Sequence, residues 1–385
     1  MSGRTLSVAG MLAAVLGLLL LTGSSLLAAP EPYVVGAVFD ITGPASPLGT
    51  PERDTARLVE EMVNRTGGIN GHPLRLVIYD NGSEETKCVM AFKKLIEKDE
   101  VLAIVGPSQS GTTLAVVNIV EAAQVPLVSC AASIKIVSPV KKWVFKTPQN
   151  DNFAVQKLIE YFRTHRIKRI AFINVANAFG TSGLEQAQKL FPGYGMSIIA
   201  TESFGPTDTD MTAQLTRIRA ANPDAVVCWG TNPGPALVTR NMRQLGMTQP
   251  LFMSHGVANR KFIELAGDAA DGVIFPAGRL LVVDAIPKTD PRHRVLARYS
   301  KLFQTKYGRE ADTFGGHAWD ALHLVVAALK AVGPDRAKMR DYIEKTRGFV
   351  GTAGIFNFSP QDHNGLSKDA FVMVKISNGR WELMK

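Results

Sequence analysis

Two short loops rich in small hydroxyl residues carry the clearest chemical signal in this chain. The first, Gly106–Gly111, follows the apolar run Val101–Val105, and the second, Cys130–Ser133, follows the apolar run Pro126–Ser129. Two buried strands separated by a helix-periodic stretch predict a β-loop-α-β-loop unit. Ligands bind beyond the carboxyl ends of parallel strands. A hydroxyl and free backbone N–H groups at a helix start favour an anion such as a carboxylate.

Enzymatic interpretations of the first loop do not survive inspection of its residues. Gly106–Thr113 has the glycine spacing of a P-loop, but Thr112 stands where that motif needs lysine. The same turn begins like G-x-S-x-G but ends in Ser110 instead of glycine. An alternative is that the glycines only shape a turn and the serines only cap a helix. A second loop with the same chemistry, one βα unit later, favours a binding site instead.

Strand and helix patterns alternate along most of the chain, which predicts an α/β fold with parallel sheets covered by helices on both faces. Besides the unit above, we expect strands at Tyr33–Phe39, Leu74–Tyr79, Arg169–Asn174, Ser197–Glu202, Ala225–Trp229, Leu251–Ser254 and Phe371–Ile376. Helices are expected at Pro51–Asn64, Glu84–Lys98, Phe153–Arg163, Thr181–Leu190, Asp210–Ala221, Pro235–Leu245, Pro291–Tyr307, Gly316–Ala331 and Arg336–Thr346. Asn378 and Gly379 predict a hairpin turn near the end of the chain.

The N-terminus has the pattern of a signal peptide. Arg4 provides a positive charge, Met11–Leu21 is apolar, and small residues follow, with a cut expected near Ala28 or Ala29. A retained anchor is the alternative, but about eleven apolar residues are few for a bilayer span. We therefore assign residues 1–28 to a signal peptide and expect an exported, periplasmic protein.

The chain of 385 residues has a formal net charge of +9, and its basic residues gather in two stretches. These contain Lys141, Lys142 and Lys146, then Arg163, Arg166, Lys168 and Arg169. Neither stretch has interleaved aromatic residues or a nucleic-acid-binding motif. We expect both to be solvated faces and expect no nucleic-acid partner.

Cysteine and histidine spacing gives no support for a metal or redox site. Cys88, Cys130 and Cys228 are far apart, and an odd count leaves at least one thiol free. Cys228 falls in an apolar strand pattern, which predicts a packed residue. The seven histidines show neither H-E-x-x-H nor H-x-x-x-H spacing. We expect no metal and no cofactor.

Several further segments occur in a specific order along the chain. They are Ile41–Ala45 with Gly49, Gly67–Gly71, Val105–Gly111, Val125–Ser129 with Ala131–Ser133, Asn222–Val226 and Gly351–Gly354. In this order they resemble the extracellular ligand-binding receptors of the leucine/isoleucine/valine-binding type. These receptors are the type I periplasmic solute-binding proteins of ABC importers. The resemblance covers essentially the whole mature chain.

The resemblance implies two Rossmann-like lobes with parallel sheets, joined by a hinge of three crossovers. Residues 29–148 and 278–348 would form the N-terminal lobe. Residues 149–277 and 349–385 would form the C-terminal lobe. A solute that touches both lobes would close the hinge, and a membrane permease would read the closed form. We expect a monomeric binding protein and not an enzyme.

The resemblance also implies which residues bind the ligand. Ser110, with Gln109 beside it, would hold a ligand carboxylate together with the second loop, from Ala131 to Ser133. Phe179 matches an aromatic residue that precedes glycine in the family, and the loop after Trp229 supplies a further candidate. The full set of candidate residues is Gln109, Ser110, Ala131, Ser133, Phe179, Asn232 and His255.

One departure from the family pattern bears on the ligand. Amino-acid binders of this type usually place an acid where this chain has His255, to hold the ligand ammonium. Imidazole pairs poorly with an ammonium, so we expect a small organic or aromatic acid. Alternatives remain open: the alignment is shifted and another acid serves, the ligand is a branched-chain amino acid, or the protein is a sensory receptor subunit. A hydrolase is a remote fourth possibility.

Overall fold

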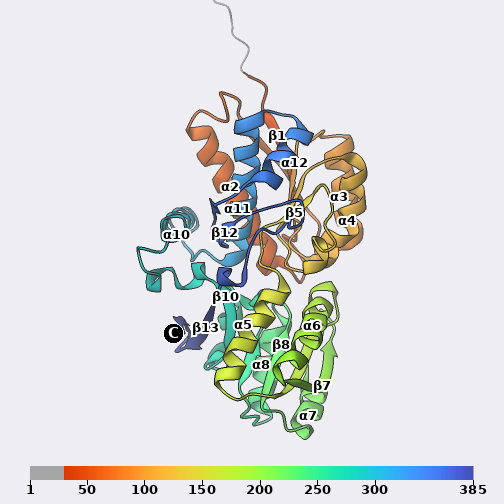
Figure 1. Cartoon of the computed structure of the whole chain (residues 1–385), viewed down its shortest axis with the longest axis vertical. Helices are drawn as coiled ribbons and strands as arrows, with labels where there is room; N and C mark the ends of the chain where they lie inside the picture. Colours follow the sequence, from red (N-terminus) through yellow and green to blue (C-terminus); the bar gives the residue numbers. More distant parts are fainter. Residues whose placement is uncertain (1–29, 385) are drawn as a thin grey trace, which may run out of the picture. The chain divides into compact units, whose positions relative to one another are not determined.

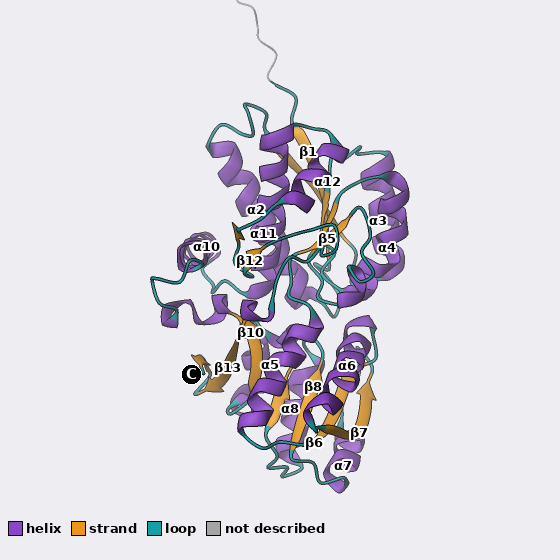
Figure 2. Ribbon diagram, viewed as in Figure 1, coloured by secondary structure: helices purple, strands orange, loops and turns teal. Residues whose placement is uncertain are grey.

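A computed structural model describes residues 30–384 of the chain, so the predicted signal peptide, residues 1–28, lies outside the described residues. From Pro32 onward the chain forms one compact unit. It contains two main sheets and a two-stranded pair (Figures 1 and 2). No helix in the described part has the length and apolarity needed to cross a bilayer.

The first sheet has five parallel strands in the order β2-β1-β3-β4-β5. These are β1 (Tyr33–Phe39), β2 (Leu74–Asp80), β3 (Ile104–Val105), β4 (Leu127–Ser129) and β5 (Val144–Lys146). One face packs against α3 (Glu85–Glu97) and α4 (Ser110–Ala123). The other packs against α2 (Ser46–Arg65), α10 (His293–Tyr307), α11 (Thr313–Val332) and α12 (Arg336–Lys345). In Figure 1 the blue helix α11 lies beside the red-orange α2, although they are far apart in sequence.

The second sheet has seven strands in the order β14-β13-β10-β9-β8-β6-β7. Strand β13 runs antiparallel to both of its neighbours, β10 and β14. The seven strands are β6 (Arg169–Val175), β7 (Ser197–Phe204), β8 (Ala225–Trp229), β9 (Leu251–Met253), β10 (Ile274–Gly278), β13 (Phe371–Ser377) and β14 (Arg380–Leu383). Helices α5 (Asp151–Thr164) and α6 (Ala178–Leu190) cover one face. The other face is covered by α7 (Thr212–Ala220), α8 (Gly234–Gln244) and α9 (Arg260–Ala266).

The predicted α/β fold with parallel sheets is confirmed, and so is the C-terminal hairpin. Asn378 and Gly379 have φ values of 49° and 67°, the left-handed conformation that such two-residue turns require. Helix α9 was not anticipated, because its 7 residues are too few to show helical periodicity clearly.

The segment after α12 crosses from one sheet to the other. The pair β11 (Phe349–Val350) and β12 (Ile355–Phe356) precedes a loop whose buried residues, including Phe358 and Leu366, pack in the core of the first sheet. Only from Phe371 does the chain join the second sheet. The domain limits given above remain a prediction, and this packing favours a boundary near residue 370 over one at residue 348.

Helix α2 begins at Ser46, five residues before the predicted start at Pro51. Proline has no N–H, so Pro51 cannot bond the carbonyl four residues earlier, which belongs to Pro47. The side chain of Asn259, which follows β9, donates to that carbonyl at 2.8 Å. A residue more than two hundred positions away therefore satisfies the group that proline leaves unpaired, and local sequence cannot reveal this.

Candidate functional site

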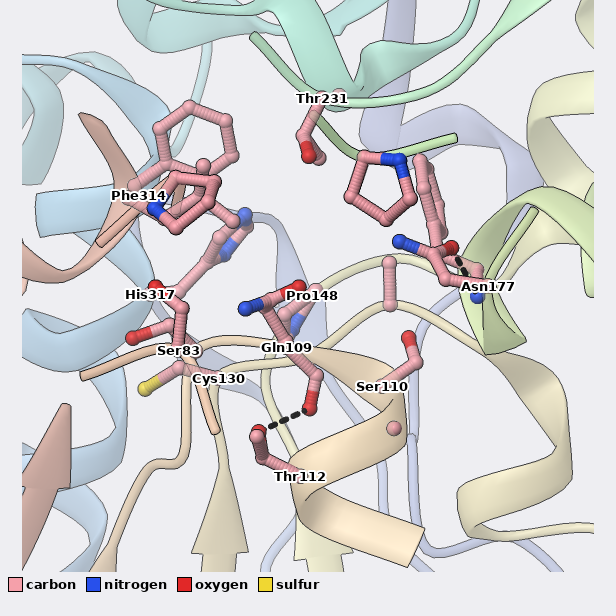
Figure 3. A pocket seen from close by; sticks show the side chains of 18 of the residues that line it. Ser83, Gln109, Ser110, Thr112, Cys130, Pro148, Asn177, Thr231, Phe314 and His317 are labelled. Atoms are coloured by element: carbon pink, nitrogen blue, oxygen red, sulfur yellow. Dashed lines mark hydrogen bonds between the residues drawn. The ribbon is translucent and has the colours of Figure 1, made fainter. Parts of the chain in front are cut away.

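A cavity of about 230 Å³ lies between loops that follow strands of both sheets (Figure 3). Its walls combine hydroxyl, amide, imidazole and aromatic side chains from both sheets. Pockets for drug-sized ligands usually measure roughly 300–1,000 Å³, so this cavity suits a smaller solute.

Four of the seven predicted site residues line this cavity: Gln109, Ser110, Phe179 and His255. Ser110 opens helix α4, whose first N–H groups have no partner within the helix. Its Oγ accepts a hydrogen bond from the Ser133 N–H at 3.2 Å, so its own hydrogen is left to donate. In Figure 3 the Ser110 hydroxyl points into the cavity, across from Thr231 and Asn177.

The other three predicted residues do not line the main cavity. Ala131 is buried beside the lining residue Ala132. The Ser133 hydroxyl donates to Ser182 Oγ at 2.8 Å and accepts from the Lys135 N–H, so its side chain is already satisfied by protein. What this residue offers toward the site is its backbone N–H, through Ser110.

Asn232 lies on a separate small cavity of about 20 Å³. Its Nδ2 donates to Asn259 Oδ1 at 3.4 Å, and the side chain is 2% exposed. The loop after β8 does reach the main cavity, but through the neighbouring Thr231. A shift of one residue along a loop cannot be resolved from sequence spacing alone.

His255 lies within a group of aromatic rings. Its ring centroid is 5.4 Å from that of Phe179 at an interplanar angle of 87°, and the rings of Trp229 and Phe371 are 5.9 and 5.2 Å away. Neither ring nitrogen has a protein partner. Burial lowers the pKa of His255 to about 3, and Lys146 contributes to the same effect. The imidazole is therefore neutral at physiological pH and can donate one hydrogen bond and accept another.

Helix α6 positions Phe179 through its cap. Asn177 Oδ1 accepts from the N–H groups of Phe179 and Gly180, both at 3.0 Å. Asn177 also lines the cavity, which makes it both a cap and a candidate ligand contact.

Sequence reasoning missed two further groups of lining residues. Phe314 and His317 lie at the start of α11, which returns to the cavity long after the βα units. Burial lowers the pKa of His317 to about 3. Ser83 and Glu85 follow strand β2, and Glu85 is the single carboxylate among the described lining residues. Polar residues after a strand could have indicated this second group, whereas nothing local indicates the first.

The prediction that Lys146 lies on a solvated face is wrong. Its side chain is fully buried, and Nζ donates to the Ala132 carbonyl at 2.5 Å and to Asn150 Oδ1 at 2.7 Å. The residue is the last of the edge strand β5, and its N–H donates to the His363 carbonyl. The C-terminal segment thus covers an edge that the local sequence leaves open.

Two buried carboxyl groups lie beneath the first loop. Asp40 and Glu52 are both fully buried, and the Ser108 hydroxyl donates to a Glu52 carboxyl oxygen. Burial raises the pKa of Asp40 to about 6 and that of Glu52 well above its usual value. Because Ser108 lines the cavity, these acids support the floor of the site while staying out of contact with it.

We expect Glu52→Gln to weaken the pH dependence of stability. A carboxyl with a raised folded-state pKa stabilises the fold fully below its unfolded pKa, and this contribution is lost as pH rises toward the folded pKa. The contribution of Glu52 to the free energy of unfolding should therefore decline as pH rises above about 4.5, by up to about 1.4 kcal/mol per pH unit. Urea unfolding at several pH values measures this slope.

The matched control is Glu97→Gln, the same substitution at an exposed position of α3. It should keep the wild-type slope. A Glu52→Gln protein with the wild-type slope would show that Glu52 ionises in the folded protein as readily as in the unfolded chain.

Comparisons with known proteins agree with this architecture. A sequence model described as "Periplasmic binding protein" matches residues 32–380. The leucine-, isoleucine-, valine-, threonine-, and alanine-binding protein of Pseudomonas aeruginosa is 24% identical over 76% of this chain and 76% of its own length. Leu/Ile/Val-binding protein homolog 3 of Brucella melitensis is 21% identical over 92% of this chain and 94% of its own.

Solved structures give the same result at the level of fold. An extracellular ligand-binding receptor from Rhodopseudomonas palustris HaA2 has a TM-score of 0.87 at 26% identity, covering 92% of this chain and 100% of that one. The branched-chain amino acid transporter substrate binding protein LivJ from Streptococcus pneumoniae, in complex with isoleucine, has a TM-score of 0.82 at 26% identity with the same coverage. These relatives are solute-binding proteins rather than enzymes. The chain belongs to the periplasmic binding protein family and has the type I periplasmic binding protein fold.

Proposed function

We propose that this protein is the periplasmic substrate-binding component of an ABC importer and that its ligand is a small apolar amino acid, with the branched-chain amino acids as first candidates. The named relatives support this ligand class over the organic acid that the sequence favoured. In this proposal residues 1–28 direct export and are removed, and a membrane permease is the partner.

One observation carries the proposal. The Ser110 hydroxyl, a donor suited to a carboxylate, and the Glu85 carboxylate, an exposed acceptor suited to an ammonium, both line the cavity. A Cβ atom added to Gly111 would come within 2.6 Å of Glu85 Oε1, so Glu85 lies against the residue next to Ser110. An α-amino acid carries its carboxylate and ammonium on one carbon, which matches this pair. The aromatic lining residues Phe179 and Phe314 would contact the ligand's side chain.

A second candidate is a carboxylic acid without an amine. The observation that favours it is His255, a neutral, buried side chain with two unpartnered nitrogens at the position where the family usually has an acid. A ligand with a hydroxyl, carbonyl or aromatic ring at that end would suit the imidazole better than an ammonium.

Contacts between the two sheets' loops suggest how occupancy would be reported. Hydrogen bonds already described join Ser133 to Ser182 and Asn259 to Pro47. In a third hydrogen bond, the Ile134 N–H donates to Asp151 Oδ2 at 3.3 Å. Since the cavity is lined from both sheets, a ligand that touches both walls would stabilise the closed arrangement by its differential affinity. The permease would then recognise that arrangement.

Calorimetric titration with matched pairs of compounds tests the ligand. L-leucine and 4-methylpentanoate differ only in the amine, as do L-phenylalanine and 3-phenylpropanoate. We expect an amino acid to bind more tightly than its partner, and Glu85→Gln to weaken that amino acid by about tenfold or more, because a charged hydrogen bond is lost. The same variant should leave binding of the matching acid almost unchanged.

Glu84→Gln is the control, because this neighbouring carboxylate is exposed like Glu85 but pairs with Lys87 and does not line the cavity. Tighter binding of 4-methylpentanoate or 3-phenylpropanoate than of its amino acid would establish the second candidate instead. Binding of none of the four compounds would contradict the proposed ligand class.

A further inference from the structure

Lys146 is a buried cation close to the cavity that takes no part in its lining. Among the described residues, no carboxylate oxygen lies within 4.0 Å of its Nζ, so it has no direct ion-pair partner. Its two hydrogen bonds go to neutral oxygens, those of the Ala132 carbonyl and the Asn150 amide. A buried ammonium without a counter-charge is costly, so its surroundings must compensate for it.

A chain of hydrogen bonds leads from this ammonium to the cavity. Nζ donates to the carbonyl of Ala132, which belongs to the same peptide group as the N–H of Ser133. That N–H donates to Ser110 Oγ at 3.2 Å. The Ser110 hydroxyl points into the cavity (Figure 3), and its hydrogen has no acceptor among the described residues.

Each bond in this chain points the same way. A cation at the carbonyl end of a peptide group polarises it and makes its N–H a stronger donor, and bonds in series reinforce one another. Because Ser110 Oγ accepts from Ser133, its hydroxyl is oriented to donate. Through these hydrogen bonds, the positive charge of Lys146 therefore makes the Ser110 hydroxyl a stronger donor to a ligand oxygen in the cavity.

We propose that Lys146 is the counter-charge for the ligand's carboxylate, acting through the Ala132–Ser133 peptide and the Ser110 hydroxyl without touching the ligand. Lys146 is thus a positioning residue. The inference rests on the proposed binding of a carboxylate-bearing solute, and it holds for an amino acid and for an acid without an amine alike.

The other ionisable groups around Lys146 leave this role to it. His255 on the second sheet's loop and His317 on α11 are both neutral. Asp151 on α5 accepts from the Ser182 hydroxyl and the Ile134 N–H, and Asp362 on the C-terminal segment accepts from the Asn364 and Gly365 N–H groups. Both acids favour a charged Lys146, yet burial outweighs them and lowers the pKa of the ammonium.

A bound carboxylate should favour the charged form of Lys146 and raise its pKa. Affinity for a carboxylate should then fall as pH rises through the pKa of Lys146 in the free protein, because binding is linked to proton uptake there. An uncharged ligand of the same shape should show no such dependence. A role confined to folding would produce neither effect.

The test uses the mature chain with lysine labelled with ¹³C at Cε and amides with ¹⁵N, observed by NMR. Acetate serves as a carboxylate fragment and acetamide as its uncharged control, so the identity of the natural ligand does not matter. We expect acetate to shift the Ser110 and Ser133 amides and to raise the pKa of Lys146 by about one unit. Acetamide should leave that pKa unchanged.

Two variants complete the test. Lys146→Gln should lower acetate affinity by about tenfold, equivalent to one pKa unit. Lys142→Gln removes the same charge from an exposed position four residues earlier and should retain wild-type affinity. The wild-type titration decides the question alone if Lys146→Gln does not fold.

The two proposals fail in different ways. Acetate that shifts the Ser110 amide while the pKa of Lys146 stays constant would overturn the role of Lys146 only. Acetate that shifts neither amide at saturating concentration would contradict the carboxylate site itself, and with it the proposed function.

Discussion

Ser110→Ala is expected to weaken binding of L-leucine, or of whichever matched compound binds, by about 10- to 100-fold. The substitution removes a hydroxyl that accepts from Ser133 and donates into the cavity. Loss of a hydrogen bond to a charged group typically costs about 1.5–3 kcal/mol. It also disconnects the buried ammonium of Lys146 from the ligand. Isothermal titration calorimetry on the two proteins measures the effect directly.

Ser133→Ala provides the contrast. Sequence reasoning expected both serines to hold the ligand, but the Ser133 hydroxyl bonds to Ser182, and its N–H survives the substitution. We therefore expect a loss of affinity of at most about fivefold, or about 1 kcal/mol, because the two hydrogen bonds lost, to Ser182 and from Lys135, are neutral and do not involve the ligand. Equal losses in the two variants would contradict the arrangement described above, as would wild-type affinity in Ser110→Ala.

His255→Glu is expected to change which ligand the cavity prefers. Residue 255 lines the same cavity as Glu85, so a carboxylate here would add to the attraction of Glu85 for the ammonium of an amino acid and would repel an acid that lacks one. A buried charge left without a partner costs about 3–5 kcal/mol. We expect the ratio of L-leucine to 4-methylpentanoate affinity to rise by about 100-fold, which corresponds to about 2.7 kcal/mol.

His255→Gln separates charge from shape, because glutamine matches glutamate in size but is neutral. His255→Gln should leave the ratio of L-leucine to 4-methylpentanoate affinity within about threefold of wild type, a change in relative binding free energy of less than about 0.7 kcal/mol. If both variants change the ratio equally, loss of the imidazole ring and not the added charge determines the preference. An unchanged ratio in His255→Glu would show that the ligand's ammonium lies out of reach of residue 255 and contacts Glu85 alone.

The local sequence pattern was enough to predict most helices and strands and the part of the site formed by the loop at Ser110. Apolar runs such as Ala225–Trp229 form the central strands, and the small hydroxyl loop at Ser110 does reach the cavity. These features depend on residues that are neighbours in sequence, where periodicity and turn chemistry act directly.

What the sequence could not predict depends on distant segments. The burial of Lys146 requires the C-terminal segment around His363, and the start of α2 requires Asn259. His317 reaches the cavity only because α11 packs back onto the first sheet. Likewise, the Ser133 hydroxyl turns away because Ser182, on another helix, offers a partner. In each case, contacts with residues far away in the sequence determine where the side chain lies or where the helix begins.

The three thiols of this chain have a consequence for how the protein can be made and observed. Cys88, Cys130 and Cys228 are all free and buried, and burial raises the pKa of each, that of Cys88 to about 12. Thiolates are the reactive form, so these cysteines are poor substrates for oxidants and alkylating dyes. Folding therefore needs no oxidative step, and a cysteine introduced at an exposed position such as Met90 would be the one that a fluorophore labels.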